Sequence, residues 1–585
     1  MKGWGEMVRS KTECFNFAAH VARGKWTSVF AAFLIMSTSG TKYLFSMYST
    51  DIKTNFGYSQ SMSSTLNKCN DIGTTMGILS GLIVEVIPTR FVLLMGSITN
   101  FLGYFMIWLA FTERIHKPEF WLMCVYIFIG AHAQNFAVTA SVVTSLKNFP
   151  ERRSMLLGLF KGYQGLSGSI LSIICSAIYG DDSASLILLS AWLPALVSLS
   201  AMYIIGEKKV NIRQQKEVNV FYHFLYLSAA LAAYLMTMTL VQSHIAFRAA
   251  YVGFAIVLCI LLFLPGVVAL RQEVVLWKEM QTPPTTIIVE IPRAVEQDQN
   301  FSANQEEAEE DTIVVEEEQN SSEVTQTSCF AAISNKPKRG EDFGILQALV
   351  STDMLIIFLA TFVGLGSCLT ALENMQQIGE ALQYEPKTVI TLISLINIWN
   401  FFGRVLCGFI SEKLVRKYQV PRPLMLSAVL FMSCIGLLFI AFPFKNSIYL
   451  ASVIISFTLG AQLPLALSVI FDLFGLKHYA TLFNCGQVAS PLGQYLLNNQ
   501  FTRRLYDIEA MQLHGSEGLG MPLVCKGKQC FCLSFTFMAI ATFFGGLLSL
   551  ILAARTQEFY QSDIYRRYRG EELETVVAST LSADR

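Results

Sequence analysis

Long apolar stretches separated by short polar turns occupy most of the 585-residue chain. A helix needs about 20 mostly apolar residues to cross a bilayer. Fourteen stretches are long enough, and the pattern therefore predicts an all-α membrane protein. The expected spans are 26–47, 66–87, 91–111, 119–146, 155–179, 184–206, 220–241, 246–269, 351–373, 387–410, 424–443, 447–473, 480–499 and 531–554. Those beginning near Leu66 and Tyr479 are rich in Asn, Ser, Thr and Gly, which is typical of helices that face a polar cavity.

The order of these spans predicts two six-helix bundles with two extra helices between them. The expected divisions are a cytoplasmic N-terminus (1–25), an N-terminal bundle (26–206), two linking helices (207–270), an acidic loop (271–349), a C-terminal bundle (350–554) and a cytoplasmic tail (555–585).

Composition supports this reading. The hydrophobic fraction is 53% and only 15% of residues are charged, against about 25% in soluble domains. A soluble protein this apolar could not cover its surface with polar groups, whereas a membrane protein needs no such cover.

The 43 basic and 43 acidic residues balance overall but are unevenly placed. Between Arg271 and Asp342 there are sixteen acidic and six basic residues. This interval is too charged to form a core, so we expect a disordered cytoplasmic loop that could recruit a protein partner. Two glycosylation sequons, at Asn300 and Asn320, fall within it and would be unused on that side.

The remaining basic excess lies in short loops between spans, which indicates membrane topology rather than nucleic-acid binding. Lys and Arg gather in the loops on the side of the two termini, although the last loop on the other side is also basic. Both termini are therefore expected in the cytosol.

About 25 polar and mixed residues precede the first apolar run, so we expect a signal-anchor helix rather than a cleaved signal peptide. Plasma membrane and endomembranes both remain open.

One pattern occurs twice at an offset of 327 residues. In each copy an apolar helix carries a glycine, ends four residues later in an acid, and turns through a basic loop into the next helix. The glycine permits close helix contact, and the acid and base can pair across helices to lock one conformation. The alternative is a chance match between two apolar helices with polar ends. The expected gating residues are Gly81, Glu85, Arg90, Gly408, Glu412, Lys413, Lys417 and Asp472, the last paired with Lys477.

Parallel six-helix repeats with a long middle loop resemble the major facilitator superfamily. The stretch from Gly81 to Arg90 is similar to its signature but departs from it at Val86 and Pro88, whereas the stretch from Gly403 to Lys413 is closer.

A second resemblance is carried by several separate stretches, which include Asn148–Glu151, Leu159–Gly168, Ala489–Gly493, Leu505–Asp507 and Cys525–Cys530. In these stretches the chain resembles the plant nodulin-like branch, which includes the nuclear-fusion-defective-like proteins. The resemblance implies a multi-pass membrane transporter. Lys42 does not fit that pattern.

Ionisable side chains within membrane spans are costly and usually face a cavity or a partner. Arg404, about mid-membrane in the eighth core helix, is the strongest binding candidate, because a guanidinium can hold a carboxylate with two parallel hydrogen bonds. Its Gly-Arg context resembles monocarboxylate and oxalate transporters. The alternative is a structural arginine bonded to helix carbonyls or to a fixed acid. Lys161 would add a second cation, unless it snorkels to the membrane surface.

Two further titratable residues have open interpretations. Glu373 could take up a proton if it is buried, or it could be a solvated acid at a helix end. His132 could bind substrate or relay protons, or it could be an interhelical hydrogen bonder. Near the midplane, the residues that could supply hydrogen bonds are Tyr163, Asn135, Asn397, Asn400, Gln462 and Asn484. Monocarboxylate transporters tend to carry an aspartate where Asn400 stands, which puts their proton-coupling scheme in doubt here.

Cys525 and Cys530 lie in the last loop on the non-cytoplasmic side, where either a disulfide or free thiols are plausible. Most other cysteines sit singly in apolar segments, and no pattern predicts a metal site or a cofactor. Walker, GxSxG, HExxH and dinucleotide motifs are absent from the sequence, which disfavours an ATP-driven pump and the common hydrolases.

The sequence thus favours a secondary transporter of a small solute, such as an organic anion, embedded in the lipid bilayer and coupled to protons in one version. The alternative is a transporter-like scaffold or receptor that signals through its acidic loop.

Overall fold

The computed structural model describes residues 15–180, 182–208, 217–241, 248–281, 337–514, 525, 527–562 and 564, and the regular elements in this part are helices. They are α2 (Lys25–Thr38), α3 (Thr41–Phe56), α4 (Gln60–Thr75), α5 (Gly77–Val86), α6 (Thr89–Phe111), α7 (Phe120–Asn148), α8 (Arg153–Ile178), α9 (Ser183–Ala201), α10 (Glu217–Val241), α11 (Arg248–Gln281), α13 (Ile345–Leu349), α14 (Thr352–Glu373), α15 (Met375–Ala381), α16 (Pro386–Tyr418), α17 (Arg422–Ala441), α18 (Ser447–Phe474), α19 (Tyr479–Gln494), the π-helix η2 (Tyr495–Thr502), α20 (Arg503–His514) and α21 (Gln529–Gln561).

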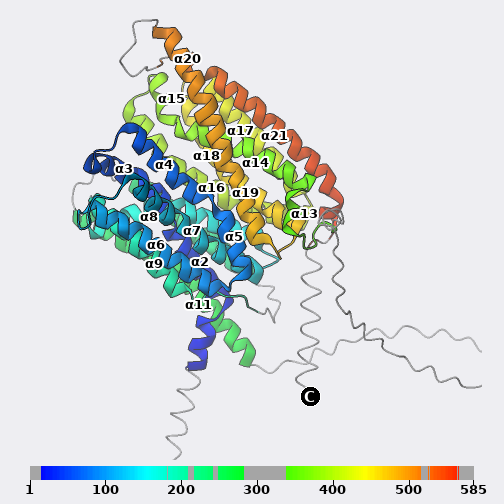
Figure 1. The fold of residues 1–585 in the computed structure, drawn as a ribbon. Helices are drawn as coiled ribbons and strands as arrows, with labels where there is room; N and C mark the ends of the chain where they lie inside the picture. The colour runs from blue at the N-terminus through cyan, green and yellow to red at the C-terminus, as the bar shows by residue number, and fades with distance from the viewer. Residues whose placement is uncertain are drawn as a thin grey trace, which may run out of the picture.

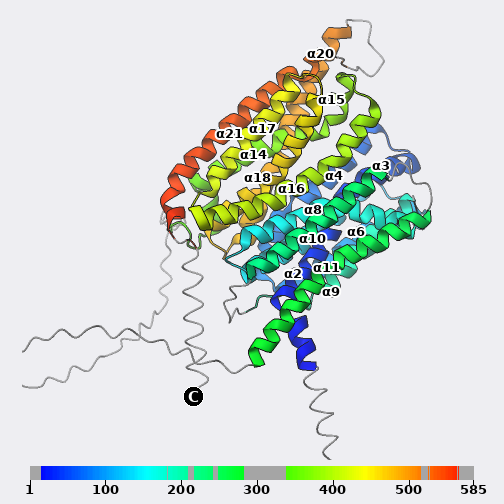
Figure 2. The same ribbon diagram turned by 180° about the vertical axis from the view of Figure 1, so that it is seen from behind.

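The helices form two bundles that lie side by side (Figures 1 and 2). Helices α2 to α9 make the N-terminal bundle and α14 to α21 make the C-terminal bundle. We call the side where α2 begins and α21 ends the terminal side. The opposite side, which carries α15 and α20, is the distal side (Figure 1).

Two predicted spans are interrupted helices. The expected span 26–47 is divided between α2 and α3, and 66–87 is divided between α4 and α5. The first break occurs at Ser39 and Gly40, where the backbone passes directly against α8. A side chain at Gly40 would lie 2.6 Å from the backbone nitrogen of Gly168. Only glycine permits so close an approach, and the apolar pattern alone did not reveal the break.

Ten helices in the described part are long and apolar enough to cross a membrane, and the chain is a multi-pass membrane protein. The fourteen-helix count itself stays a prediction. Four predicted spans are not single helices that are both long enough and apolar enough by this measure. They are α2 with α3, α4 with α5, α8 and α19. The helices of the two divided spans and α19 have at most 16 residues each, whereas α8 has 26 residues but includes Arg153, Lys161 and several Gly and Ser. Each of the four spans borders the cavity described below.

The linking helices α10 and α11 lie against the N-terminal bundle (Figure 2). Helix α11 packs along α2 and α8, and α10 contacts α8 and α16. At the terminal side, Lys25 Nζ is 2.5 Å from Glu217 Oε1. The buried carboxylate of Glu273 accepts a hydrogen bond of 2.7 Å from the Trp26 backbone N–H, at the start of α2. A carboxylate at a helix N-terminus is stabilised by the free N–H groups there.

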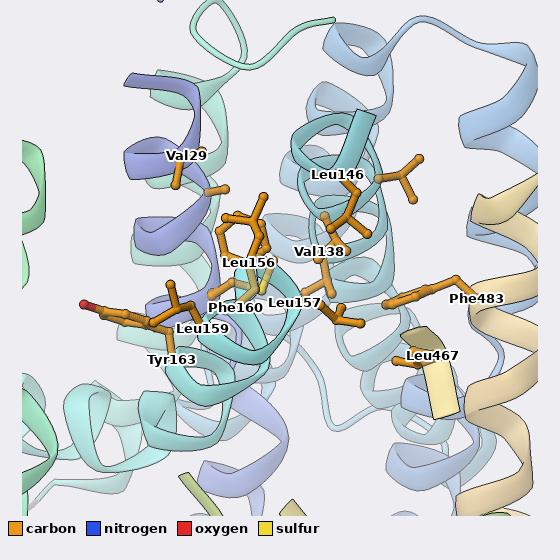
Figure 3. Close-up of a cluster of buried hydrophobic side chains, with 14 of the residues drawn as sticks. Val29, Val138, Leu146, Leu156, Leu157, Leu159, Phe160, Tyr163, Leu467 and Phe483 are labelled. Carbon is orange, nitrogen blue, oxygen red and sulfur yellow. The ribbon is translucent and has the colours of Figure 1, made fainter. Parts of the chain in front are cut away.

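A buried apolar cluster joins the two bundles near the terminal side (Figure 3). It includes Val29 of α2, Val138 of α7 and Leu156 of α8, together with Leu467 and Phe483 from the C-terminal bundle. Because this contact is apolar and well buried, it excludes water from the space between the bundles at that end.

The acidic loop is described only at its two ends. Residues 282–336, with Asn300 and Asn320, lie outside the described part, as do residues 1–14 and most of the tail after Ser562. Helix α11 extends to Gln281, beyond the predicted boundary at 270. Near its other end the loop is hydrogen-bonded to the end of α18. The Gly340 N–H donates to Leu473 O at 3.0 Å, and the Phe343 N–H donates to Phe474 O at 3.1 Å.

Within the C-terminal bundle, α14 and α19 approach through Gly366 and Gly493. A Cβ added at Gly366 would lie 2.7 Å from the carbonyl carbon of Gly493, which is backbone and cannot move aside locally. We expect Gly366→Val to lower stability by about 1–3 kcal/mol through overpacking. Thermal unfolding of the detergent-purified protein measures this effect. Gly253→Val is the matched control, because nothing lies within 4 Å of its added Cβ. Equal melting temperatures for the two variants would contradict this packing.

Candidate functional site

A polar cavity of about 430 Å³ lies between the bundles. Its lining residues come from the first, second, fourth and fifth helical units of each bundle: α2/α3, α4/α5, α7 and α8 on one side, and α14, α16, α18 and α19 on the other. Helices α6, α9, α17 and α21, the third and sixth units, contribute no lining residue. The same four positions are used in both halves, so the internal repeat extends to the cavity wall.

Lys161 of α8 and Arg404 of α16 both line this cavity, as the sequence predicted, and they are 1% and 9% exposed. The Lys161 ammonium donates to Gln487 Oε1 at 2.7 Å and to Gln164 Oε1 at 3.1 Å. It also lies 4.9 Å from the centre of the Phe483 ring. Within the described residues Lys161 has no ion-pair partner, so its charge is solvated by neutral amides and a ring.

Arg404 is also bonded only to neutral groups in the described part. Its Nε donates to Asn400 Oδ1 at 2.7 Å, and one terminal nitrogen donates to the Lys161 backbone carbonyl at 2.5 Å. The bond to the Lys161 carbonyl agrees with the alternative in which Arg404 is a structural arginine bonded to a helix carbonyl. Among the described residues, no acid is bonded to Arg404. The second bond crosses between the bundles and brings the two cations to one region of the cavity.

The predicted amides Asn135, Asn397, Asn400 and Asn484 line the cavity as well. Asn135 Nδ2 donates to Gly73 O at 3.1 Å, within the N-terminal bundle. Asn484 Nδ2 donates across the bundle interface to Thr139 Oγ1 at 3.1 Å. The wall is therefore rich in neutral groups that can donate or accept.

Three predicted binding residues are not among the cavity-lining residues. Tyr163 is stacked on Phe33, with ring centres 4.7 Å apart, and Figure 3 shows its ring directed away from Leu467 and Phe483. Tyr163 is two residues from Lys161, which places it on the opposite face of α8.

His132 and Gln462 are likewise buried in helix contacts. His132 Nδ1 lies 3.3 Å from Gly73 O, and its ring stacks on Phe128. This agrees with the interhelical hydrogen-bonding alternative. Gln462 is fully buried, and its Nε2 lies 3.6 Å from Cys368 Sγ.

Sequence reasoning missed Gln164 and Gln487, the two amides that contact Lys161. The helical spacing could have identified both residues. Gln164 is three residues after Lys161, and Gln487 is three residues after Asn484, so each shares a face with a predicted cavity residue.

Glu373 lies at the distal end of α14, lines the cavity and is exposed. Gln494 Nε2 donates to one of its oxygens, and Asn498 Nδ2 donates to the other at 2.6 Å. The proton-coupling role required a buried carboxyl group, whereas the Glu373 side chain is exposed. The position agrees with the alternative of a solvated acid at a helix end.

The terminal side of the cavity is closed by the first copy of the repeated motif. Glu85 of α5 accepts from the Thr481 backbone N–H at 2.9 Å and contacts His478 Nδ1 at 2.9 Å, both at the start of α19. A carboxylate at this position interacts favourably with the positive end of the helix dipole. A Cβ added at Gly81 would lie 2.7 Å from Ala480 O, so the glycine permits the approach. The acid of the first copy therefore makes its contacts with the other bundle.

The second copy meets α8 in the same way. A Cβ added at Gly408 would lie 2.6 Å from Ser154 O and 3.1 Å from the Gly158 Cα. Glu412 is fully buried and accepts from Arg416 and Arg422, each at 2.8 Å. Arg416 also reaches Glu151 of the N-terminal bundle at 3.2 Å.

Asp472 belongs to the same buried cluster. It accepts from Arg422 and from the Tyr560 hydroxyl, the latter at 2.9 Å, rather than pairing with Lys477 as predicted. Lys413 and Lys417 are exposed on the terminal side. On the distal side, a disulfide joins Cys525 and Cys530.

Two repeated six-helix bundles around a central polar cavity, closed at one end, define the major facilitator fold. The family comparisons agree with this class. Residues 25–270 match the family model described as Nodulin-like, and residues 340–562 match the model described as NFD4, C-terminal domain. The N-terminal part of the chain is thus similar to the Nodulin-like family, and the C-terminal part is similar to the NFD4 C-terminal domain.

Individual relatives extend the same picture. The Arabidopsis thaliana Protein NUCLEAR FUSION DEFECTIVE 4 is 23% identical over 546 residues, which cover 92% of this chain and 89% of that protein. An uncharacterized membrane protein of Saccharomyces cerevisiae is 27% identical over 180 residues, 31% of each chain.

Among solved structures, the E. coli fucose:proton symporter matches 91% of this chain and 98% of its own at 13% identity, with a TM-score of 0.46. A proton:xylose symporter matches 92% and 95% at 12% identity, with a TM-score of 0.48. A bacterial homologue of the iron transporter ferroportin matches 90% and 98% at 10% identity, with a TM-score of 0.49.

The contact of Glu85 with α19 can be tested directly. Glu85→Gln removes the charge that accepts from Thr481, and charge-assisted hydrogen bonds contribute about 1.5–3 kcal/mol. We expect amide hydrogen exchange in the first turn of α19 to become at least threefold faster. Glu207→Gln is the matched control, since Glu207 pairs with Lys147 inside the N-terminal bundle. The proposed closure is wrong if Glu85→Gln leaves exchange in α19 unchanged.

Proposed function

We propose that this protein is a secondary transporter that moves a small organic anion, with a carboxylate group, by alternating access. The observation that carries the proposal is the convergence of Lys161 and Arg404 on one cavity without a carboxylate partner among the described residues. A buried charge is costly unless it is paired. An anionic substrate would supply the missing partner.

The neighbours of Arg404 strengthen this argument. Because Asn400 is an amide and not an acid, it orients the guanidinium without neutralising it. The second partner is a backbone carbonyl, also uncharged. The planar guanidinium thus keeps its full charge and its capacity for paired hydrogen bonds to a carboxylate.

Cavity size and lining favour a small polar solute. A volume of about 430 Å³ lies at the lower end of the usual range for small-molecule sites, which is about 300–1,000 Å³. Leu365, Leu369 and Leu463 provide an apolar part of the wall, and several amides surround the cations. This combination suits a short carbon skeleton that carries a carboxylate and further hydrogen-bonding groups.

The arrangement of contacts supports alternating access. Contacts between the bundles gather at the terminal side, around Glu85 and Gly408, while the cavity lining continues to Glu373 at the distal end. The described state is therefore closed at the terminal side. By the distribution of Lys and Arg, that side faces the cytosol. Glu373 is exposed at the mouth, and we do not assign proton coupling to it.

The first test is uptake of labelled lactate, succinate and malate into proteoliposomes that contain the purified protein. We expect saturable uptake by the wild type and at least a tenfold loss in Arg404→Ala at equal protein content. Arg404→Lys should retain part of the activity, because it keeps the charge but not the paired hydrogen bonds. Lys445→Ala, which removes an exposed cation, is the control. Unchanged uptake in Arg404→Ala would reject the anion-binding role.

A second test neutralises Arg404 without removing it. Asn400→Asp preserves the size of the side chain and places a carboxylate on the Arg404 Nε–H. If the uncompensated charge attracts the substrate, the concentration for half-maximal uptake should rise at least tenfold. Asn400→Ser, which removes the amide without adding charge, separates the electrostatic effect from the loss of the hydrogen bond. Equal effects of the two substitutions would contradict the electrostatic account.

A further inference from the structure

A second cavity, of about 610 Å³, lies on the terminal side at the junction of the bundles. The end of α5, the start of α6, the end of α7 and the segment after α9 form most of its wall. Lys477 and Ala480, from the α18–α19 turn and the start of α19, complete it from the C-terminal bundle. This cavity therefore borders the closed gate but is separate from the set of residues around Lys161 and Arg404.

Four cations line this cavity, namely Arg90, Lys147, Lys208 and Lys477, against the two acids Glu85 and Glu207. Both acids are already engaged. Glu207 pairs with Lys147 at 2.6 Å, and Glu85 accepts from the start of α19. Within the described residues this leaves Arg90, Lys208 and Lys477 without an ion-pair partner.

The three remaining cations come from separate segments, so their convergence results from the fold and not from a basic run in the sequence. Burial lowers the pKa of the Lys208 ammonium, and the positive charges of Arg90 and Arg23 lower it further, against a smaller opposite effect of Glu273. A bound anion would relieve this repulsion. Because Thr89, Arg90 and Phe91 open the 23-residue helix α6, the positive end of its dipole also faces the cavity.

Apolar side chains continue the cavity wall outward. Val86 and Phe91 line it and are 83% and 59% exposed, respectively. In a multi-pass protein, exposed apolar residues at the ends of spanning helices face lipid. A site with cations inside and hydrocarbon-facing residues beside it matches a molecule with an anionic head and an acyl tail. Basic pockets between helices on the cytoplasmic side commonly bind phosphorylated lipid head groups.

We propose that this cavity binds the phosphate of an anionic phospholipid, with Arg90, Lys208 and Lys477 as its ligands. A phosphate suits the site because its oxygens can accept from three cations that approach from different directions. The acyl chains would lie over Val86 and Phe91. Lys477 belongs to the C-terminal bundle and the other two cations to the N-terminal bundle, so a bound lipid bridges them and stabilises the closed terminal side.

The test measures binding of dioctanoyl phosphatidylinositol 4-phosphate to the full-length protein in detergent, by native mass spectrometry and by titration. Dioctanoyl phosphatidylcholine is the neutral-lipid control, and soluble inositol 1,4-bisphosphate separates lipid from free phosphate ester. The variant combines Arg90→Gln, Lys208→Gln and Lys477→Gln. The control combines Lys338→Gln, Lys413→Gln and Lys417→Gln, which remove the same charge from exposed positions on the terminal side.

We expect the wild type and the control variant to bind the phosphoinositide at least tenfold more tightly than the cavity variant. The wild type should also prefer it at least tenfold over phosphatidylcholine. A conservative variant, with Arg90→Lys, Lys208→Arg and Lys477→Arg, should retain binding and shows that loss does not arise from misfolding. Equal affinity of the cavity variant and the control variant would overturn the site. Equally tight binding of the soluble bisphosphate would overturn its assignment to a lipid.

Discussion

Hydrogen bonds between the bundles hold two buried cations at the centre of this protein. Arg404 of the C-terminal bundle donates to the main-chain carbonyl of Lys161 in the N-terminal bundle. The bond brings two cations together at a depth where bulk water and counter-ions are scarce, and charges at such depth usually face a cavity or a partner. The polar wall, the glutamines around Lys161 and Asn400 beside Arg404 follow from the need to solvate these charges. The same need explains why α8 carries polar residues within its 26-residue length.

The repeated motif provides the complementary constraint at the terminal side. Its two glycines, Gly81 and Gly408, each lie against the backbone of the other bundle, at α19 and at α8. The two acids then differ. Glu85 binds the start of the facing helix directly, whereas Glu412 is enclosed by Arg416 and Arg422 within its own half. The repeat is thus retained in backbone packing, while the charge contacts have diverged between the halves.

Much of the fold could be predicted from the sequence because bilayer spans have a length and polarity set by the membrane. Two bundles, linking helices and the cavity-facing character of the spans near Leu66 and Tyr479 all follow from that constraint. The breaks in the first two spans could not be read in the same way. The break at Gly40 depends on a close approach to α8, and nothing in the local apolar pattern reports a contact with a helix more than a hundred residues away.

The candidate site shows a similar limit. Lys161 and Arg404 could be predicted because a charge inside an apolar span is conspicuous. Tyr163 and Gln462 are polar residues in the right spans, but helix rotation places them in helix contacts outside the cavity lining. Rotation depends on packing between helices, which polarity alone does not determine. For the same reason the sequence did not identify the start of α19 as the partner of Glu85.

Alternating access around the two cations is the central claim, and distances between the bundles test it most directly. Spin labels at Gln60 and Glu380 on the distal side, and at Lys147 and Lys413 on the terminal side, report the distance between the two bundles at each end of the cavity in liposomes. On adding succinate or lactate, the account predicts a shorter distal distance together with a longer terminal distance, and loss of this response in Arg404→Ala. Distances that do not change, or that change in the same sense at both ends, would contradict it.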